Sequence, residues 1–320
     1  MFPTGSAPWF RRKMSWTWLA VFAAVAGILA GQVDAAGTAA DGPEVRPPAW
    51  SFLALQAERL GNRVDAEVWI TALPAAGEQT FFLPSPKGAP FRPHGLEVLK
   101  LSIRIRVDLM GRSAVRIENH AWFDPKDGTP LYLIRTRSGL DDYYQAFRFT
   151  REGVFRRQRE PASAAEALRP VETWTKVGEH FYAYPPNAEN CHPILETSTL
   201  IYLLCEASGY DPRSRSSLCV FHKRQLHRVS LQEAGTAEAV DFDFLEKRGG
   251  GEARRSGKGP ANRIRIESRP IGSYRGEVED LFRDGTLLYL SPEGALPLAA
   301  SCEMPLIGRV EMKLREIHLK

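Results

Sequence analysis

The sequence predicts a mainly β protein: one large curved antiparallel sheet or half-barrel, with a single apolar helix packed on its concave face. The first observation is that, after residue 60, short segments alternate apolar and polar side chains, which is typical of strands with one buried face. Asp-Gly pairs at 127–128 and 284–285 favour tight hairpin turns between such strands. Residues 197–209 break the alternation with a continuous apolar run, which predicts the helix.

The N-terminal 35 residues resemble a bacterial secretory signal peptide. Residues 11–13 are basic, residues 16–30 are apolar, and Val33 and Ala35 suit the −3 and −1 positions of a cleavage site. We therefore expect residues 1–35 to be removed on export to the periplasm. The alternative is an uncleaved anchor in the inner membrane, for which the apolar core is short against the roughly 20 residues of a membrane span.

Charge does not favour a nucleic-acid partner. The chain has 42 Lys and Arg against 38 Asp and Glu, and residues 1–35 contain three of the basic residues and one acidic residue. The exported chain would therefore carry 39 basic and 37 acidic residues, which is close to balance.

The elements follow one another along a single domain, predicted to cover residues 50–320 after a flexible leader at 36–49. Residues 50–60 are expected to form a short helix. Strands are predicted at 64–72, 98–107, 113–122, 131–136, 143–150, 153–158, 171–177, 180–184, 218–222, 225–232, 238–246, 262–269, 287–290, 296–300 and 308–319. Between them, residues 248–260 are rich in Gly, Arg and Lys and predict a flexible basic loop.

The run at 197–209 reads as a helix because both of its ends carry helix signals. Ser198 or Thr199 can cap the first turn, and Gly209 suits the position after the last turn. Three leucines share one face at i, i+3 and i+4 spacing: Leu200, Leu203 and Leu204. We expect these leucines, together with Trp122, to line a groove on the sheet. A strand is the alternative, since the run is apolar throughout.

Four cysteines are present, and export permits disulfides. Four cysteines allow three pairings, and the sequence does not choose among them. Cys205–Cys219 is the first candidate, because it would tie the predicted helix to the next strand. A buried free thiol in the helix face is the alternative. The cysteine spacings fit no zinc motif.

The sequence contains no motif that identifies an enzyme, a metal site or a cofactor site. It lacks Gly-x-Ser-x-Gly, and its Gly-rich stretch near Lys258 does not have the spacing of a phosphate-binding loop. His222 and His227 are five residues apart, which would place them on opposite faces of one strand. The other histidines considered have no carboxylate or histidine at ligand spacing: His94, His120, His180 and His192.

Aromatic and basic side chains leave two interpretations open. Four aromatic residues just before the predicted helix could line a pocket for an apolar ligand or could pack within the sheet: Trp174, Phe181, Tyr182 and Tyr184. Arg104, Arg106 and Arg116 could face an anionic lipid, but an ordinary solvated sheet face is the simpler interpretation.

The C-terminal part resembles a known family. Residues 287–298 (LLYLSPEGALPL) and 305–314 (PLIGRVEMKL) are similar to the closing pattern of a proteobacterial exported family, domain of unknown function 3108. Residues 200–204 and 122–125 resemble its apolar helix and its early turn. The resemblance implies a periplasmic β-rich protein, similar to the half-barrels of lipoprotein carriers, with no catalytic residues. The basic loop and the four cysteines depart from the family.

These observations predict a periplasmic, non-enzymatic protein that binds an apolar or amphipathic cell-envelope ligand, such as a lipid, in a curved β-sheet. The alternative is an envelope scaffold or assembly partner that binds another protein. A third hypothesis is an enzyme whose carboxylates converge only in the folded chain.

Overall fold

The computed structural model describes most of the chain after residue 49. The described residues are 50–110, 112–139, 141–188, 191, 193–199, 217–222, 224–272, 286–292, 296–304 and 308–320. The predicted signal peptide and leader lie outside them, as do Leu200, Leu203, Leu204 and Cys205. Residues 197–199 are helical, and the rest of the helix predicted to end at Gly209 lies outside the described residues.

The described residues are mainly β, as the sequence predicts. Their strands are β1 (Trp50–Arg59), β2 (Asn62–Pro74), β3 (Glu97–Leu109), β4 (Arg112–Phe123), β5 (Pro130–Ser138), β6 (Tyr143–Phe149), β7 (Gly153–Glu160), β8 (Lys176–Ala183), β9 (Ile194–Glu196), β10 (Leu218–His222), β11 (Gln225–Arg248), β12 (Gly251–Pro270), β13 (Thr286–Leu290), β14 (Pro297–Met304) and β15 (Gly308–Leu319). The short helices are α2 (Ala75–Glu78), η2 (Gln79–Phe81), α3 (Ala164–Ala167), η3 (Val171–Thr173) and η4 (Pro186–Ala188).

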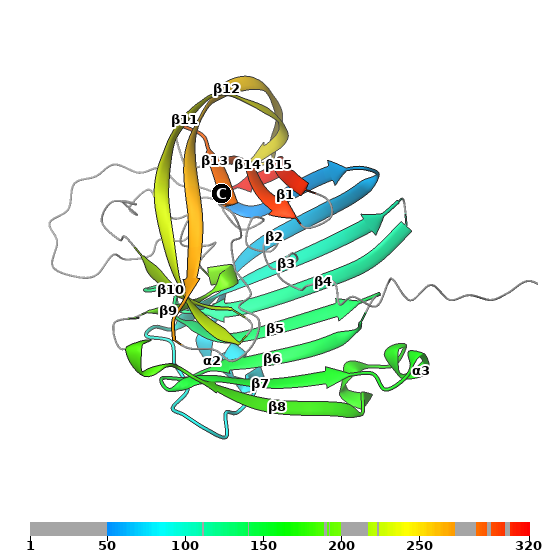
Figure 1. The fold of residues 1–320 in the computed structure, drawn as a ribbon, viewed down its shortest axis with the longest axis vertical. Helices are drawn as coiled ribbons and strands as arrows, with labels where there is room; N and C mark the ends of the chain where they lie inside the picture. Colours follow the sequence, from blue (N-terminus) through cyan, green and yellow to red (C-terminus); the bar gives the residue numbers. More distant parts are fainter. Residues whose placement is uncertain are drawn as a thin grey trace, which may run out of the picture.

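All 15 described strands belong to one sheet. Its order is β8-β7-β6-β5-β4-β3-β2-β1-β15-β14-β13-β12-β11-β10-β9, and β11 also pairs with β15. Neighbours are antiparallel except for the parallel pairs β9–β10 and β11–β15. The additional pair closes β11 to β15 into a ring, and Figure 1 shows the long strands β11 and β12 crossing the plane of β1 to β5. The sheet is therefore large, as predicted, but mixed.

The main hydrophobic core lies between strands β1 to β4 and the ring formed by β11 to β15. Leu101 and Ile103 of β3 share one buried cluster with Val220 of β10, Val229 of β11 and Leu288 of β13. We call the face of β1 to β8 that carries Leu101 the inner face, and the opposite face, which carries Arg104, the outer face. Because side chains alternate along a strand, the periodic segments of the sequence map directly onto these two faces.

The predicted helix at 50–60 is wrong, since these residues form β1. The pairing register shifts twice, between Trp50 and Phe52 and between Ala54 and Leu55. A register shift adds a residue between two buried positions. The buried residues are consequently Trp50, Leu53, Leu55 and Ala57, and the first spacing of three imitates a helix.

The predicted flexible loop at 248–260 is also wrong. Its residues lie at the tip of a long hairpin formed by β11 and β12, and Gly249 and Gly250 make the turn with φ values of 55° and 83°. Two consecutive residues with positive φ are typical of the tight hairpin turn that matches strand twist. Gly257 pairs with Phe242, whose ring lies 3.4 Å from where a Cβ on that glycine would be. The aromatic ring thus covers a glycine that offers no side chain to the pairing.

The predicted Cys205–Cys219 disulfide is wrong, because Cys219 is bonded to Cys191. The S–S distance is 2.01 Å and the two Cα atoms are 5.4 Å apart. Parallel pairing of β9 with β10 places Ile194 opposite Cys219, which brings the chain just before Ile194 to the same place. The bond therefore links the approach to β9 with β10.

Candidate functional site

The inner face becomes aromatic where it reaches β5 and β6. Leu133, Phe147 and Phe149 form a second buried cluster with Phe221 of β10. The rings of Phe149 and Phe221 meet edge to face, with centroids 6.0 Å apart. We call these four side chains, three aromatic rings and Leu133, the aromatic floor. Strand β10 therefore packs on the inner face of β5 and β6, from which it is distant in the sequence.

A row of polar side chains crosses the same face beside the aromatic floor. The pairing register places Asn119, Arg135, Gln145 and Gln158 opposite one another on β4 to β7. Arg135 Nε donates to Asn119 Oδ1 at 3.3 Å, and Gln145 Nε2 donates to Gln158 Oε1 at 2.8 Å. Polar side chains in a partly buried position have to be hydrogen-bonded or lose the free energy of hydration. This face therefore combines apolar and polar surface within neighbouring rows.

Arg135 reaches a buried carboxylate on the covering strands. Its Nη2 lies 3.5 Å from Oε1 of Glu196, whose side chain is 2% exposed. Burial raises the pKa of the Glu196 carboxyl, although the positive charge of Arg135 and hydrogen bonds from Ser198 oppose that effect. The loss of hydration thus outweighs the attraction to Arg135, as is common for buried ion pairs.

Glu196 also caps the helical turn at 197–199. Its carboxylate accepts the backbone N–H of Ser198 at 2.7 Å. In return, Thr199 Oγ1 accepts the N–H of Glu196 and donates to its carbonyl oxygen, both at 2.8 Å. This reciprocal arrangement is that of a capping box. The predicted cap at Ser198 or Thr199 is therefore wrong, because the helical turn begins earlier and Glu196 takes the role.

Two buried histidines lie beside this turn. His222 Nδ1 is 3.1 Å from Thr197 Oγ1, and the rings of His222 and His227 are 6.3 Å apart. The sequence predicted opposite faces of one strand, which is wrong because the chain turns between His222 and Gln225. His227 pairs with Val220, two residues before His222, so both histidines share one face.

Basic and aromatic side chains meet at the far end of the inner face. Phe147 pairs with Arg156 of β7, and Arg156 pairs with His180 of β8, so both lie on the inner face. The guanidinium of Arg156 lies 5.3 Å from the ring centroid of Tyr182. Tyr182 also contacts His180 at 4.4 Å and Phe221 at 6.0 Å between ring centroids.

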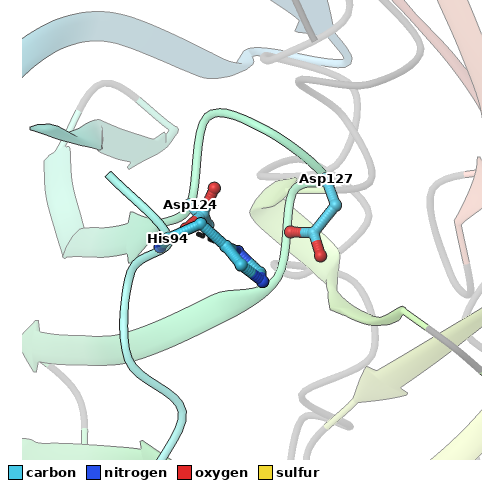
Figure 2. Close-up of side chains that lie close together, drawn as sticks. All are labelled: His94, Asp124 and Asp127. Carbon is cyan, nitrogen blue, oxygen red and sulfur yellow. Dashed lines mark hydrogen bonds and ion pairs between the residues drawn. The ribbon is translucent and has the colours of Figure 1, made fainter. Parts of the chain in front are cut away.

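A histidine from the loop before β3 and two aspartates from the turn after β4 come together, although the sequence did not indicate this cluster. Figure 2 shows the side chains of His94, Asp124 and Asp127 close together. Their potential ligand atoms lie within 4.8 Å of one another. The buried Asp124 accepts hydrogen bonds from the backbone N–H of His94 and Lys126, and its Oδ2 lies 3.1 Å from His94 Nδ1. These contacts give the cluster a structural role, because they hold the loop before β3 against the turn after β4. Thirty residues separate His94 from Asp124, so local spacing could not reveal the contact.

The predicted groove residue Trp122 lies on the outer face, so its assignment to an inner groove is wrong. Its neighbours across the sheet are Lys100 and Tyr132, and Phe82 covers it after η2. Trp122 follows Ala121, which lies on the inner face. Because successive side chains of a strand point to opposite faces, Trp122 lies on the outer face. Of the four aromatic residues considered as pocket candidates, Tyr182 contacts the aromatic floor through Phe221.

Comparisons with family models, with curated proteins and with solved structures found no match in any of the three. The resemblance to domain of unknown function 3108 therefore stays a prediction. Within the described part of the chain, none of the helices has the length and apolar character needed to cross a membrane.

Proposed function

We propose that this protein is an exported, non-enzymatic protein that binds an amphipathic cell-envelope ligand at the inner face of β5 to β8. The observation that supports the proposal is the meeting of the aromatic floor with basic and polar side chains on one face. Phe147 and Arg156 are direct neighbours across two strands. An amphipathic ligand needs apolar contact for its chain and a few placed polar groups for its head, and this face offers both.

The environment of the Arg156 side chain also supports the proposal. Its Nε is buried and, among the described residues, has no hydrogen-bond partner. A buried donor without a partner costs free energy that a ligand acceptor would recover. Most buried polar groups of folded proteins are satisfied, so an unsatisfied guanidinium nitrogen beside aromatic rings supports a binding site here.

A second candidate function is an envelope scaffold that binds another protein through β8. This strand ends the described sheet, and its first five residues, 176–180, are exposed. An edge strand can accept a further strand from a partner. This candidate predicts capture of a protein in place of a small amphiphile.

Native mass spectrometry after detergent-free purification tests the proposal. We expect a species that exceeds the chain mass by one amphiphile, because the ligand would contact the half-buried Arg156 and Tyr182 beside the aromatic floor. Organic extraction should release the added mass, and the stripped protein should then bind a hydrophobic fluorescent dye. A protein that shows only its own mass and leaves dye fluorescence unchanged would contradict the proposal.

A further inference from the structure

We propose that Arg156, Arg224 and Tyr182 form a subsite for the anionic head, a phosphate or a carboxylate, of an amphipathic ligand. This inference rests on the proposed function and names the chemistry of the ligand's polar end. Arg156 belongs to β7 and Tyr182 to β8. Arg224 lies in the turn after β10, three residues beyond Phe221, whose ring is 6.0 Å from that of Tyr182. Three segments that are distant in the sequence therefore contribute to it.

The subsite lies where the aromatic floor ends. The ring of Tyr182 is 6.0 Å from that of Phe221, and the guanidinium of Arg156 is 5.3 Å from the ring of Tyr182. Phe147 and Phe221 are buried, whereas Tyr182 at the edge of the aromatic floor is half-buried. A chain lying along Tyr182 would bring its head to Arg156, which is the cross-strand neighbour of Phe147. The order of apolar and basic side chains thus matches the order of chain and head in an amphiphile.

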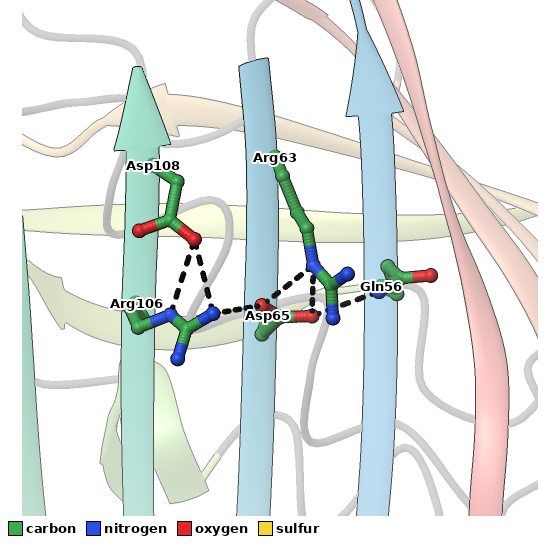
Figure 3. Close-up of polar contacts among 5 residues, drawn as sticks. All are labelled: Gln56, Arg63, Asp65, Arg106 and Asp108. Atoms are coloured by element: carbon green, nitrogen blue, oxygen red, sulfur yellow. Dashed lines mark hydrogen bonds and ion pairs between the residues drawn. The ribbon is translucent and has the colours of Figure 1, made fainter. Parts of the chain in front are cut away.

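Among the described residues the subsite has no ion pair at short range, although the negative charge of Glu160 acts on Arg156 from farther away. Neither Arg156 nor Arg224 has a carboxylate oxygen within 4 Å among those residues, whereas the next residue, Arg157, contacts Glu179 Oε1 at 2.7 Å on the outer face. Outer-face arginines of β2 and β3 are paired too, as Figure 3 shows. Arg63 lies 2.9 Å from Asp65, and Arg106 lies 3.0 Å from Asp108. Within the described residues, the outer-face arginines are therefore paired with carboxylates at short range, whereas Arg156 and Arg224 are not.

Arg224 and Tyr182 both act electrostatically on Arg156. Burial lowers the pKa of the Arg156 guanidinium, and the positive charge of Arg224 lowers it further, against the opposing influence of Tyr182. Burial raises the pKa of the Tyr182 phenol, so its hydroxyl keeps its proton and can donate a hydrogen bond. An anion would relieve the repulsion between the arginines and accept hydrogen bonds from a planar guanidinium, which matches the geometry of phosphate and carboxylate.

Titration calorimetry with three amphiphiles that each carry one alkyl chain tests the subsite. The probes are dodecyl phosphate, dodecanoate and the uncharged dodecyl maltoside. We expect Arg156→Gln to weaken the binding of one or both anionic probes about tenfold, since a charge-assisted hydrogen bond is lost. Binding of the maltoside should change little. Arg157→Gln is the matched control, because it removes the same charge from the adjacent residue on the opposite face.

The outcomes separate the subsite from the proposed function. Stronger binding of dodecyl phosphate would identify a phosphate head, and stronger binding of dodecanoate a carboxylate head. Equal losses in Arg156→Gln and Arg157→Gln, or equal binding of charged and uncharged probes, would overturn the subsite while leaving amphiphile binding intact. Failure of the wild-type protein to bind any probe would overturn the proposed function. Arg224→Gln changes an exposed turn residue and gives the same test if Arg156→Gln fails to fold.

Discussion

Replacing Phe149 with alanine is expected to lower the free energy of unfolding by about 4 kcal/mol. The side chain is fully buried, and its ring packs against Phe221. The substitution would remove most of an aromatic ring from a packed site and leave a cavity between β6 and β10. Urea unfolding followed by circular dichroism measures the difference.

Phe81→Ala is the control for this prediction. Phe81 is 75% exposed, so its loss should change stability by no more than about 0.5 kcal/mol. Similar stability of the Phe149 and Phe81 variants would contradict the packing of β10 on the inner face. Phe149→Leu should fall between the two, because leucine fills part of the space.

Loss of the disulfide is expected to lower the free energy of unfolding by about 3.5 kcal/mol. Cys191 and Cys219 are 28 residues apart, and a bond across this separation restricts the unfolded chain. The double variant Cys191→Ser/Cys219→Ser should therefore unfold at a lower urea concentration than the oxidised wild-type protein. Reducing the wild-type protein should produce a similar shift.

Peptide mapping without reduction identifies the bonded pair directly. Cys205→Ser should leave the linked peptides containing Cys191 and Cys219 unchanged, because Cys205 does not take part in the bond with Cys219. Disappearance of the linked peptides in Cys205→Ser would instead support the pairing that the sequence suggested first.

Regular alternation made much of the sheet predictable. The segment at 98–107 alternates without interruption and corresponds to β3, in which Leu101 and Ile103 are buried. The predictions for residues 50–60 and 248–260 were wrong because the alternation of apolar and polar side chains is irregular there. Register shifts in β1 turned a period of two into a spacing of three, and the glycines and charges at 248–260 concealed a hairpin. Cross-strand partners such as Phe242 stabilise these residues, and a single segment does not reveal its partner.

The candidate site was less predictable, because its residues meet only through long-range pairing. Arg135 and Glu196 are 61 residues apart, and Arg156 meets Tyr182 only because β7 and β8 pair. The sequence indicated Tyr182 as one of several aromatic candidates but gave no reason to join it to Arg156. The sequence left the cysteine pairing open and favoured Cys205 over Cys191 as the partner of Cys219, because it does not reveal the parallel pairing of β9 and β10 that brings Cys191 to Cys219.

Photocrosslinking locates the ligand and tests the central proposal most directly. The probe is a dodecyl phosphate analogue with a diazirine on its chain, and the adducts are mapped by mass spectrometry. We predict labelling of Phe147, Tyr182 or Phe221 on the inner face, and suppression of this labelling by excess dodecyl phosphate. Labelling confined to the outer-face residues Trp69 and Trp122, or labelling that excess dodecyl phosphate does not reduce, would contradict binding at the inner face.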